Sequence, residues 1–306
     1  MLVLGTGSAS QDFVMHEPTG AAAMLVPAGI GVIMFALGLA LTPADFRRVF
    51  TAPRGVAVGM LNLAVLAPAL AFLMAELFDL PPELAVGLVL LGASPGGMMA
   101  NMLTHLARGD TALSVTMTAI SSVAAVITVP LFLELATGHF GVGAGSEFDT
   151  GGIIALVFAV TIVPVTAGLF LRQRYPEQVA ARYGLVRAAA LGVFAIVVVG
   201  AIATQHETVI TYAPQVAGAA LALNVTSMGL SFAISRLARL GSAQSTAIAL
   251  ELGIHNAALA IAVGASVTAA FSIPAAVYSS FMLFTGGAFA WVMSRRNPPV
   301  AELAAV

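Results

Sequence analysis

One acidic residue, Glu251, stands inside a long apolar stretch of the sequence. An ionisable side chain within a membrane-spanning helix is costly, so such residues usually face a cavity and serve function. His255 follows four residues later, which places it on the same face of a helix. We expect Glu251 to carry chemistry, the alternative being a structural hydrogen bond between helices. For His255, a structural role and a direct role are both open.

A second unusual feature is Ser94-Pro95-Gly96-Gly97, in the middle of another apolar stretch and followed by Asn101. Proline lacks a backbone donor and clashes with the preceding turn, and glycine adds backbone freedom. The pattern predicts a helix broken near the middle of the bilayer, whose freed backbone groups can bind a ligand. A simple proline kink, or close packing of helices at Gly92 and Gly96, would explain the pattern without a ligand.

Four oxygen-bearing side chains are expected at one depth of the membrane. At a rise of about 1.5 Å per residue, Glu251 lies roughly 10 Å from the arginine-rich membrane edge, Thr118 about 9 Å and Asn101 about 6–9 Å. Ser114 lies one turn from Thr118 on the same helix face. Carboxylate, amide and hydroxyl oxygens suit a hard cation such as Na⁺ better than a transition metal. The sequence therefore predicts a cation site formed by Asn101, Ser114, Thr118 and Glu251.

The composition is typical of a protein whose solvent is lipid. Of 306 residues, 59% are hydrophobic and 8% are charged, and the mean hydropathy is +1.01; soluble domains usually carry about 25% charged residues. Cysteine is absent, which excludes disulfides, thiolate metal sites and cysteine nucleophiles. The net charge of −2 indicates no nucleic-acid partner. No HExxH motif or glycine-rich phosphate loop occurs, so we expect neither a metal hydrolase nor an organic cofactor.

Nine apolar stretches are long enough to cross a hydrocarbon core about 30 Å thick. They are residues 21–41, 55–77, 83–105, 112–136, 151–171, 187–204, 213–235, 244–268 and 274–294. All 12 basic residues are Arg, and they fall in every second connection or after the last span. Because basic residues mark the cytoplasmic side, we predict nine transmembrane helices with the N-terminus outside and the C-terminus inside. Residues 1–20 form an extracytoplasmic tail, 21–294 the helical domain and 295–306 a cytoplasmic tail.

The two chemically unusual spans occupy matching places in the chain. The span 83–105 is the middle of the three spans in 55–136, and the span 244–268 is the middle of the three in 213–294. The two sets lie five spans apart, an odd number, so corresponding helices cross the membrane in opposite directions. Inverted repeats with a broken or polar helix at matching positions are typical of secondary transporters. No clear residue-level identity joins the two halves.

At these residues the chain resembles the bile acid:sodium symporter family. The matching stretches are residues 30–39, 95–101, 107–116 and 251–256. The Pro-Gly-Gly to Asn101 motif, joined to the Ala-Leu-Ser-Val-Thr stretch that begins at Ala112, is highly specific. With nine expected spans the chain is similar to bacterial nine-span members, whereas many members have ten.

The resemblance implies an all-α fold with a core bundle, a panel bundle and two broken helices that cross at their unwound centres. The core would comprise the spans within 55–136 and 213–294, and the panel the spans within 21–41 and 151–204. It implies a secondary active transporter, not an enzyme, that imports a small organic anion with Na⁺ by alternating access between the bundles. The chain would lie in the inner (plasma) membrane, and no oligomer is required.

The resemblance also assigns residues to sites. The first sodium site would use Asn101, Ser114, Thr118 and Glu251; the second Glu251, carbonyls near Leu252 and Ile254, and His255; the substrate would face Pro95, Gly96, Gly97 and Asn256. The chain departs from many sodium-coupled members, which have Gln where His255 stands and Gln where Leu63 falls beside Asn62, and from the Ser that often occupies the place of Ala100. Our hypothesis is that one sodium site survives, and that His255 either replaces the second sodium with a proton or abolishes that coupling.

Other classes of function are less well supported by the sequence. A membrane-embedded enzyme using Glu251 and His255 as acid and base lacks an accompanying nucleophile or metal set. A channel would be expected to show rings of pore-lining groups. Because every Arg lies in a predicted cytoplasmic connection, the anion would be held by backbone amides at helix ends and by neutral polar groups. Small carboxylates, such as 2-oxo acids or pantothenate-like precursors, are the substrates we expect.

Overall fold

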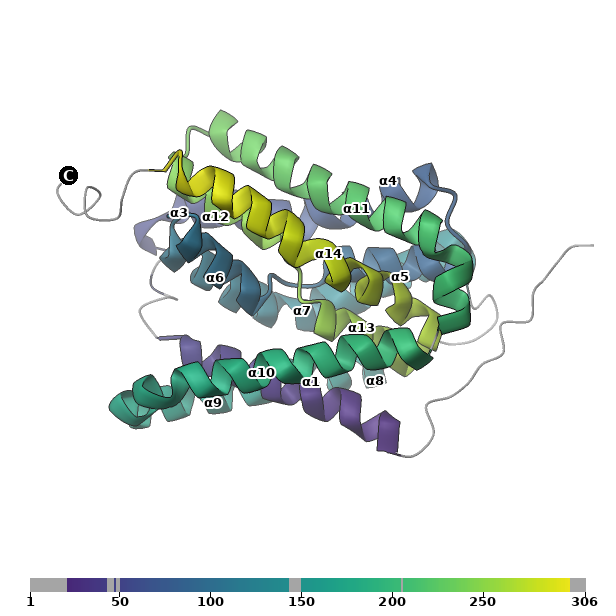
Figure 1. The fold of residues 1–306 in the computed structure, drawn as a ribbon, viewed down its shortest axis with the longest axis horizontal. Coiled ribbons are helices and arrows are strands. Elements are labelled where there is room, and N and C mark those ends of the chain that lie inside the picture. The colour runs from purple at the N-terminus through teal and green to yellow at the C-terminus, as the bar shows by residue number, and fades with distance from the viewer. Residues whose placement is uncertain (1–20, 43–46, 48–49, 143–149, 205, 298–306) are drawn as a thin grey trace, which may run out of the picture.

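Helices joined by short turns make up almost all of the described chain. The computed structural model describes residues 21–42, 47, 50–142, 150–204 and 206–297 (Figure 1). Within these residues the structure contains no β-strand beyond one isolated bridge, between Gly96 and His255. The fold is therefore all-α, as the composition predicts.

One group of helices lies along the lower side of the molecule in Figure 1. It consists of α1 (Ala21–Ala40), α8 (Thr150–Val157), η2 (Phe158–Ile162), α9 (Val163–Arg174) and α10 (Pro176–Thr204). Two glycines bring the backbones of α1 and α9 together, because a Cβ atom at Gly38 would overlap the Val165 carbonyl and one at Gly168 would overlap that of Phe35. Small residues are what allow membrane helices to approach so closely. We call these helices the panel group.

The remaining helices pack around α5 and α14 as a second, larger group. It contains α3 (Pro53–Leu61), η1 (Asn62–Leu66), α4 (Ala67–Leu77), α5 (Pro82–Ala93), α6 (Met98–Leu106), α7 (Thr111–Phe140), α11 (His206–Leu237), α12 (Ser242–Gly253), α13 (Ala257–Val267) and α14 (Ala269–Ser294). Helix α5 contacts α4, α7 and α14, and α11 contacts α12, α14 and α4. We call these helices the core group.

The two π-helical turns have a common local cause. η1 ends two residues before Pro68, and η2 ends two residues before Pro164. A proline in a helix lacks the N–H group and clashes with the carbonyl four residues back, here that of Ala64 or Val160. Both carbonyls lie within the π turns, whose wider backbone accommodates the missing hydrogen bond.

Two helices of the core group are interrupted and cross each other. α5 ends at Ala93 and α6 begins at Met98; α12 ends at Gly253 and α13 begins at Ala257. The two unwound segments pair as strands do: the N–H group of Gly97 donates to the Ile254 carbonyl, and that of Asn256 to the Pro95 carbonyl, both at 2.8 Å. Each segment thus supplies hydrogen-bond partners to backbone groups of the other, and buried backbone groups need such partners because water cannot reach them.

The turns that precede the two interrupted helices have the same geometry. Asp79 and Arg239 both have left-handed backbones, with φ of 48° and 59°. The next residue, Leu80 or Leu240, is buried and donates its N–H at 3.0 Å to the carbonyl five residues back. α5 and α12 then each run for 12 residues. The numbering differs by 160 throughout this stretch (239 − 79, 240 − 80, 242 − 82, 253 − 93).

Six helices within the described residues are long and apolar enough to cross a membrane. They are Pro53–Leu77, Thr111–Phe140, Gly151–Arg174, Pro176–Gly200, Pro214–Leu237 and Ala269–Ser294. The other three predicted spans correspond to shorter apolar helices: Pro27–Ala40, Pro82–Ala93, which continues as α6, and Ala257–Val267, which follows α12. The count of nine spans and their orientation stay predictions. Several helices extend beyond the predicted spans; the helix that contains the span 187–204, for example, begins at Pro176.

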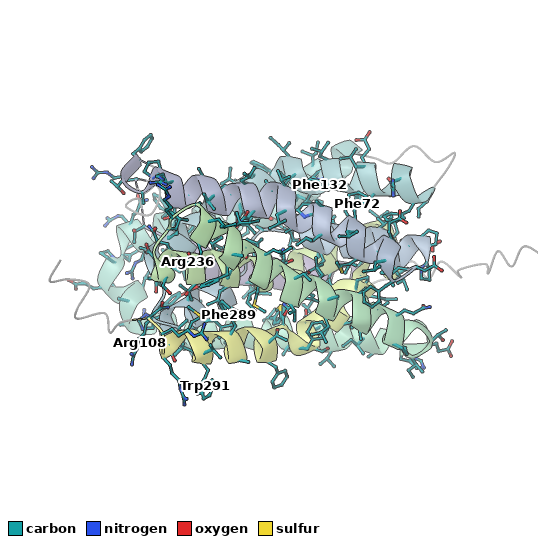
Figure 2. All side chains as sticks on the ribbon, turned by 90° about the horizontal axis from the view of Figure 1, so that it is seen from above. Phe72, Arg108, Phe132, Arg236, Phe289 and Trp291 are labelled. Atoms are coloured by element: carbon teal, nitrogen blue, oxygen red, sulfur yellow. The ribbon has the colours of Figure 1, made fainter. Side chains whose placement is uncertain are left out.

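The outer surface fits a lipid environment. Large apolar side chains such as Ile127, Phe170, Leu185 and Phe284 are exposed. Figure 2 shows Arg108 and Arg236 near one end of the molecule, close to the end of α14 that carries Trp291. The guanidinium of Arg295 stacks over the Trp291 ring at 3.8 Å; tryptophan and basic residues in this arrangement are typical of a membrane–water boundary.

Candidate cation and substrate site

Glu251 lies in the last turn of α12 and is fully buried. Its Oε1 atom accepts hydrogen bonds from Ser114 Oγ at 2.5 Å and from Thr118 Oγ1 at 2.8 Å, both on α7. The two hydroxyls are one helical turn apart, so a single carboxylate oxygen on a neighbouring helix reaches both. Burial of a carboxylate at this depth requires such compensation.

Asn101, from the first half of α6, completes the cluster. Its Oδ1 atom lies 2.8 Å from Ser114 Oγ and 3.3 Å from Thr118 Oγ1. The structure therefore brings together the four residues that the sequence places at one depth. They come from three helices, and the break before Met98 positions α6 so that its first turns run past α7.

Oxygen acceptors outnumber protons in this cluster. Ser114 and Thr118 each own one hydroxyl proton. Within hydrogen-bond distance of these two hydroxyls lie Asn101 Oδ1, Glu251 Oε1 and the Ser114 carbonyl, the last at 3.1 Å from Thr118 Oγ1. The second carboxylate oxygen, Glu251 Oε2, is buried without a hydrogen-bond partner in the described part of the chain. An oxygen-rich cluster with one carboxylate has the chemistry that holds a hard cation.

The crossing lies directly against the carboxylate. A Cβ atom at Gly96 would overlap Glu251 Oε2 and come within 2.8 Å of Cδ. Only glycine leaves room for the carboxylate at this point of the unwound backbone, because the neighbouring atoms belong to a fully buried side chain. Gly96 thus shapes the oxygen-rich cluster without contributing a side chain to it.

The residues assigned to a second sodium site have other contacts. The Ile254 carbonyl accepts from Gly97, and the Leu252 side chain lies in an apolar cluster. The ring of His255 is buried, with Nδ1 3.5 Å from the Tyr278 hydroxyl and Nε2 without a hydrogen-bond partner among the residues described. The second sodium site stays a prediction.

Two residues that sequence reasoning missed hold the end of α12. Asn224 on α11 donates from Nδ2 to the Gly253 carbonyl at 2.7 Å, and the Tyr278 hydroxyl on α14 donates to the same carbonyl at 2.8 Å. Asn224 Nδ2 also donates to the Tyr278 hydroxyl at 2.8 Å. The carbonyls in the last turn of a helix have no partner within the helix, and this pair supplies one. The only signal in the sequence was a polar residue inside each of two apolar spans.

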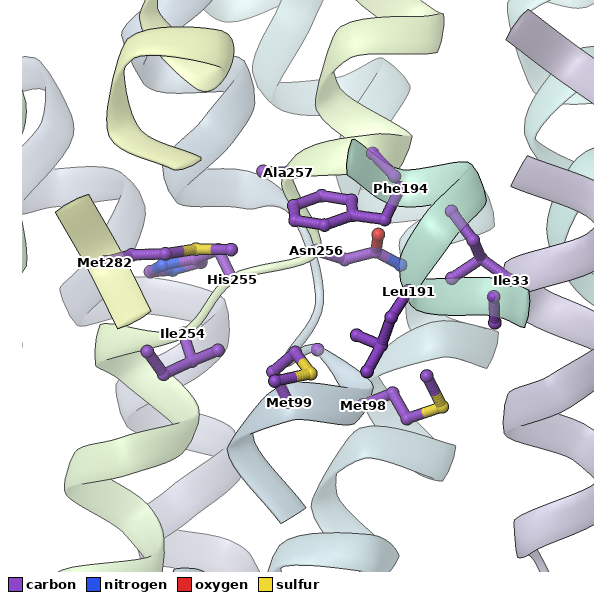
Figure 3. Close-up of a pocket in the computed structure, with 13 residues that line it drawn as sticks. Ile33, Met98, Met99, Leu191, Phe194, Ile254, His255, Asn256, Ala257 and Met282 are labelled. Atoms are coloured by element: carbon purple, nitrogen blue, oxygen red, sulfur yellow. The ribbon is translucent and has the colours of Figure 1, made fainter. Parts of the chain in front are cut away.

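A pocket that is partly open to the surface lies between the panel and core groups (Figure 3). Leu191 and Phe194 of α10 and Ile33 of α1 line one side, and Met98, Met99 and Met282 line the core side. Figure 3 shows the Asn256 side chain reaching between them toward α10. No charged side chain is among the residues that line this cavity.

The four residues predicted to face substrate divide between three surroundings. Gly97 and Asn256 line the cavity between the groups. Pro95 lines a second, smaller pocket, together with Ser121 and Thr128 of α7. Gly96 faces the Glu251 carboxylate. Two of the four are therefore placed where a ligand in the larger cavity would contact them.

Two helix N-termini open into the larger cavity. Met98 and Met99 begin α6, Ala257 and Ala258 begin α13, and all four line the cavity. The first N–H groups of a helix have no partner within the helix and carry partial positive charge. Helix α13 is capped by Asn256, whose Oδ1 accepts from Leu259 N at 3.2 Å, whereas the N-cap residue of α6, Gly97, has no side chain to cap that helix. The cavity can thus attract an anion without a basic side chain.

Comparison with known proteins decides the family. The sequence profile of the Sodium Bile acid symporter family matches residues 27–212, more than half of the chain. The chain belongs to this family. It is a multi-pass membrane protein of a transporter family and not an enzyme, as the motifs around Asn101 and Glu251 indicate.

Individual relatives extend the match over most of the chain. It is 32% identical over 280 residues to a probable chloroplast sodium/metabolite cotransporter of Arabidopsis thaliana, which covers 90% of this chain and 68% of the relative. It is 32% identical over 273 residues to a sodium-dependent transporter of Bacillus subtilis, covering 87% and 82%. The human ileal sodium/bile acid cotransporter is 30% identical over 232 residues, covering 75% and 66%. Sodium-dependent transport is thus common to its relatives.

Proposed function

We propose that this symporter imports a small organic anion together with Na⁺, by alternating access between the core and panel groups. Asn101, Ser114, Thr118 and Glu251 hold the Na⁺ ion, and the anion occupies the cavity between the groups. The observation that carries the proposal is the buried cluster of four oxygen-bearing side chains around Glu251, in which acceptors outnumber protons. Na⁺ is the coupling ion that such a hard-oxygen set favours.

The substrate is a small carboxylate such as a 2-oxo acid or a pantothenate-like precursor. The partial charges at the starts of α6 and α13 attract its carboxylate. The apolar lining, rich in flexible methionine, accepts a short carbon skeleton. Asn256 offers a neutral polar side chain within this lining, and its amide donates to Met34 Sδ of α1 at 3.6 Å. A ligand that takes this amide would replace a contact between the core and panel groups.

The membrane arrangement is part of the proposal: nine spans, an outer N-terminus, a cytoplasmic C-terminus and location in the inner (plasma) membrane. The constant numbering difference of 160 between the two turn-and-half-helix units supports two structurally repeated halves. Their crossing in opposite directions follows from the offset between corresponding helices, which is five spans, an odd number. Repeated halves of this kind provide the rocking motion of secondary transporters.

Transport uses one Na⁺ ion in this proposal. Half-helix C-terminal ends and unwound carbonyls are where transporters coordinate cations, and at the end of α12 the Gly253 carbonyl already accepts from Asn224 and Tyr278. The second candidate is coupling to a proton through His255, favoured by its buried Nε2 atom that has no hydrogen-bond partner among the described residues. Uptake measured against Na⁺ at fixed pH, and against pH without Na⁺, separates the two.

The test is uptake into proteoliposomes. A thermal-shift screen of small carboxylates in Na⁺ first identifies a ligand, and its uptake is then measured under an imposed Na⁺ gradient. We expect Glu251→Gln to reduce Na⁺-driven uptake by more than about tenfold, since the cluster loses its one full charge. Glu134→Gln, at an exposed position on α7, is the matched control and should transport as the natural protein does. Unchanged uptake by Glu251→Gln would refute the cation assignment.

A further inference from the structure

Asn297 is buried although it stands three residues beyond the end of α14. Only 3% of its surface is exposed. Every polar atom of its side-chain amide has a partner of suitable type. Nδ2 donates to the Ala107 carbonyl at 2.8 Å and to Thr246 Oγ1 at 3.2 Å, and Oδ1 accepts from Ser242 Oγ at 2.6 Å. A buried amide whose donors and acceptor are all hydrogen-bonded indicates a specific structural role.

The partners of Asn297 belong to the two half-helices that carry the cation cluster. Ala107 is the residue at the end of α6, which bears Asn101. Ser242 and Thr246 lie in the first turns of α12, which bears Glu251. Asn297 therefore links the far ends of the two half-helices and fixes their separation there. A direct backbone bond, from Asp110 N to the Ala243 carbonyl at 3.0 Å, lies beside this link.

The cation cluster lies between two places at which α6 and α12 are connected by hydrogen bonds. On one side α6 and α12 are joined at the crossing by the bond from Gly97 N to the Ile254 carbonyl. On the other side they are joined through Asn297 and Asp110. At about 1.5 Å per residue, the Asn297 link lies roughly 9 Å from Asn101 along α6 and roughly 7.5 Å from Glu251 along α12. A change in this link alters the spacing of the two half-helices at the cluster itself.

Polar groups continue from the cluster toward Asn297. Thr104 is fully buried, and its Oγ1 lies 3.4 Å from Ser114 Oγ, one turn below Asn101. Gly109 packs against Thr104, and the Ala243 carbonyl lies within 3.3 Å of the position of a Cβ atom there. Thr104 thus lies between the cluster and the turn after α6, the turn that Asn297 and Asp110 connect to α12.

We infer that Asn297 is a positioning residue that closes the arginine-rich end of the cation site and thereby sets the affinity for Na⁺ and its rate of release. The inference rests on the proposed function, because it presupposes that the cluster binds Na⁺. Asn297 does not touch the ion. It acts by holding α6 and α12 at the spacing at which Asn101 and Glu251 share their hydroxyl partners.

The experiment measures Na⁺ binding alone, with the full chain in detergent. Thermal stability is followed as Na⁺ replaces an organic cation too large for the site, and ²²Na⁺ release is timed after rapid dilution. We expect Asn297→Ala to raise the Na⁺ concentration for half-maximal stabilisation by about fivefold or more and to speed release, because three buried hydrogen bonds between the half-helices are lost. Ser294→Ala, which removes a bond confined to α14, is the control and should match the natural protein.

A second, milder variant keeps the inference testable if Asn297→Ala does not fold. Thr246→Val removes one Asn297 contact from the side of α12, and we expect a smaller shift in the same direction, about twofold. If both variants bind and release Na⁺ as the natural protein does, the inference is overturned while the cation site stands. If the natural protein itself shows no stabilisation by Na⁺, the proposed cation site fails, and with it any role for Asn297 in ion binding.

Discussion

The two interrupted helices of the core group reach the same geometry by different chemistry. Between α5 and α6 the break is made by the chain's own residues: Pro95 removes a donor, Gly96 and Gly97 carry no side chain, and Ser94 Oγ donates to the Leu90 carbonyl of its own helix at 2.9 Å. Between α12 and α13 there is no proline. There the Gly253 carbonyl is held by Asn224 of α11 and Tyr278 of α14.

This difference separates a local cause from a tertiary one. The α5–α6 break is encoded within a few adjacent residues. The α12–α13 break depends on donors about 30 residues before it and 25 residues after it. Only the first places the chain against Glu251, since Gly96 is the residue that meets the carboxylate. We conclude that the glycine break shapes the oxygen-rich cluster around Glu251, while the second break is held by side chains of α11 and α14.

The largest effect is expected from Gly96→Ala, which changes the break between α5 and α6. The added methyl group would overlap Glu251 Oε2, and because the site is buried the carboxylate must move away from Ser114 and Thr118. Overpacking of this kind costs about 1–3 kcal/mol of stability. We expect Na⁺-dependent thermal stabilisation to be lost altogether, as measured by Na⁺ titration of the melting temperature.

Gly287→Ala on α14 is the control for Gly96→Ala, because nothing lies within 4 Å of a Cβ atom there. It should keep the Na⁺ dependence of the natural protein and melt at the same or a higher temperature, since alanine favours a helix. Retention of full Na⁺ stabilisation by Gly96→Ala would show that the carboxylate has another place to go and that Gly96 does not shape the cluster.

Tyr278→Phe tests the tertiary break and should have an intermediate effect. The Gly253 carbonyl keeps Asn224 as a donor but loses the hydroxyl, and one acceptor of Asn224 Nδ2 disappears. We expect the free energy of unfolding to fall by about 1–2 kcal/mol, measured by reversible unfolding in mixed micelles. Tyr175→Phe, at an exposed position, should have no comparable effect. A stable Tyr278→Phe protein would mean that Asn224 alone suffices.

The sequence was most informative where local chemistry decides the structure. Ser94-Pro95-Gly96-Gly97 locates the first break, and the rise of a helix places Asn101, Ser114, Thr118 and Glu251 at one depth; the structure brings these four side chains together. Hydropathy finds membrane helices because every backbone group in lipid must be satisfied within a helix. Six such helices are seen in the described part of the chain, and family membership is confirmed.

The sequence was least informative where distant residues meet. Asn224 and Tyr278 are 54 residues apart, and nothing in either span indicates that both reach the Gly253 carbonyl. The repeat of 160 residues between the turns at Asp79 and Arg239 was also missed. The left-handed position holds a different non-glycine residue in each turn, and the single leucine that follows it, Leu80 or Leu240, is too common a residue to reveal a repeat. Asn297 looked like part of a tail, and only its three partners identify it as a link.

Pro95→Ala should have the smallest effect. It tests whether the proline itself is needed for the break between α5 and α6. The Pro95 carbonyl still accepts from Asn256 N, Gly97 N still donates to the Ile254 carbonyl, and two glycines still disfavour a helix. A proline restricts the unfolded chain as well as the folded one, so its loss in an extended segment costs about 0.4–1 kcal/mol. We expect a loss in that range with unchanged Na⁺ affinity, measured in the same micelles as Tyr278→Phe. A larger loss than that of Tyr278→Phe would show that the proline, rather than the pairing of the two unwound segments, keeps α5 and α6 apart.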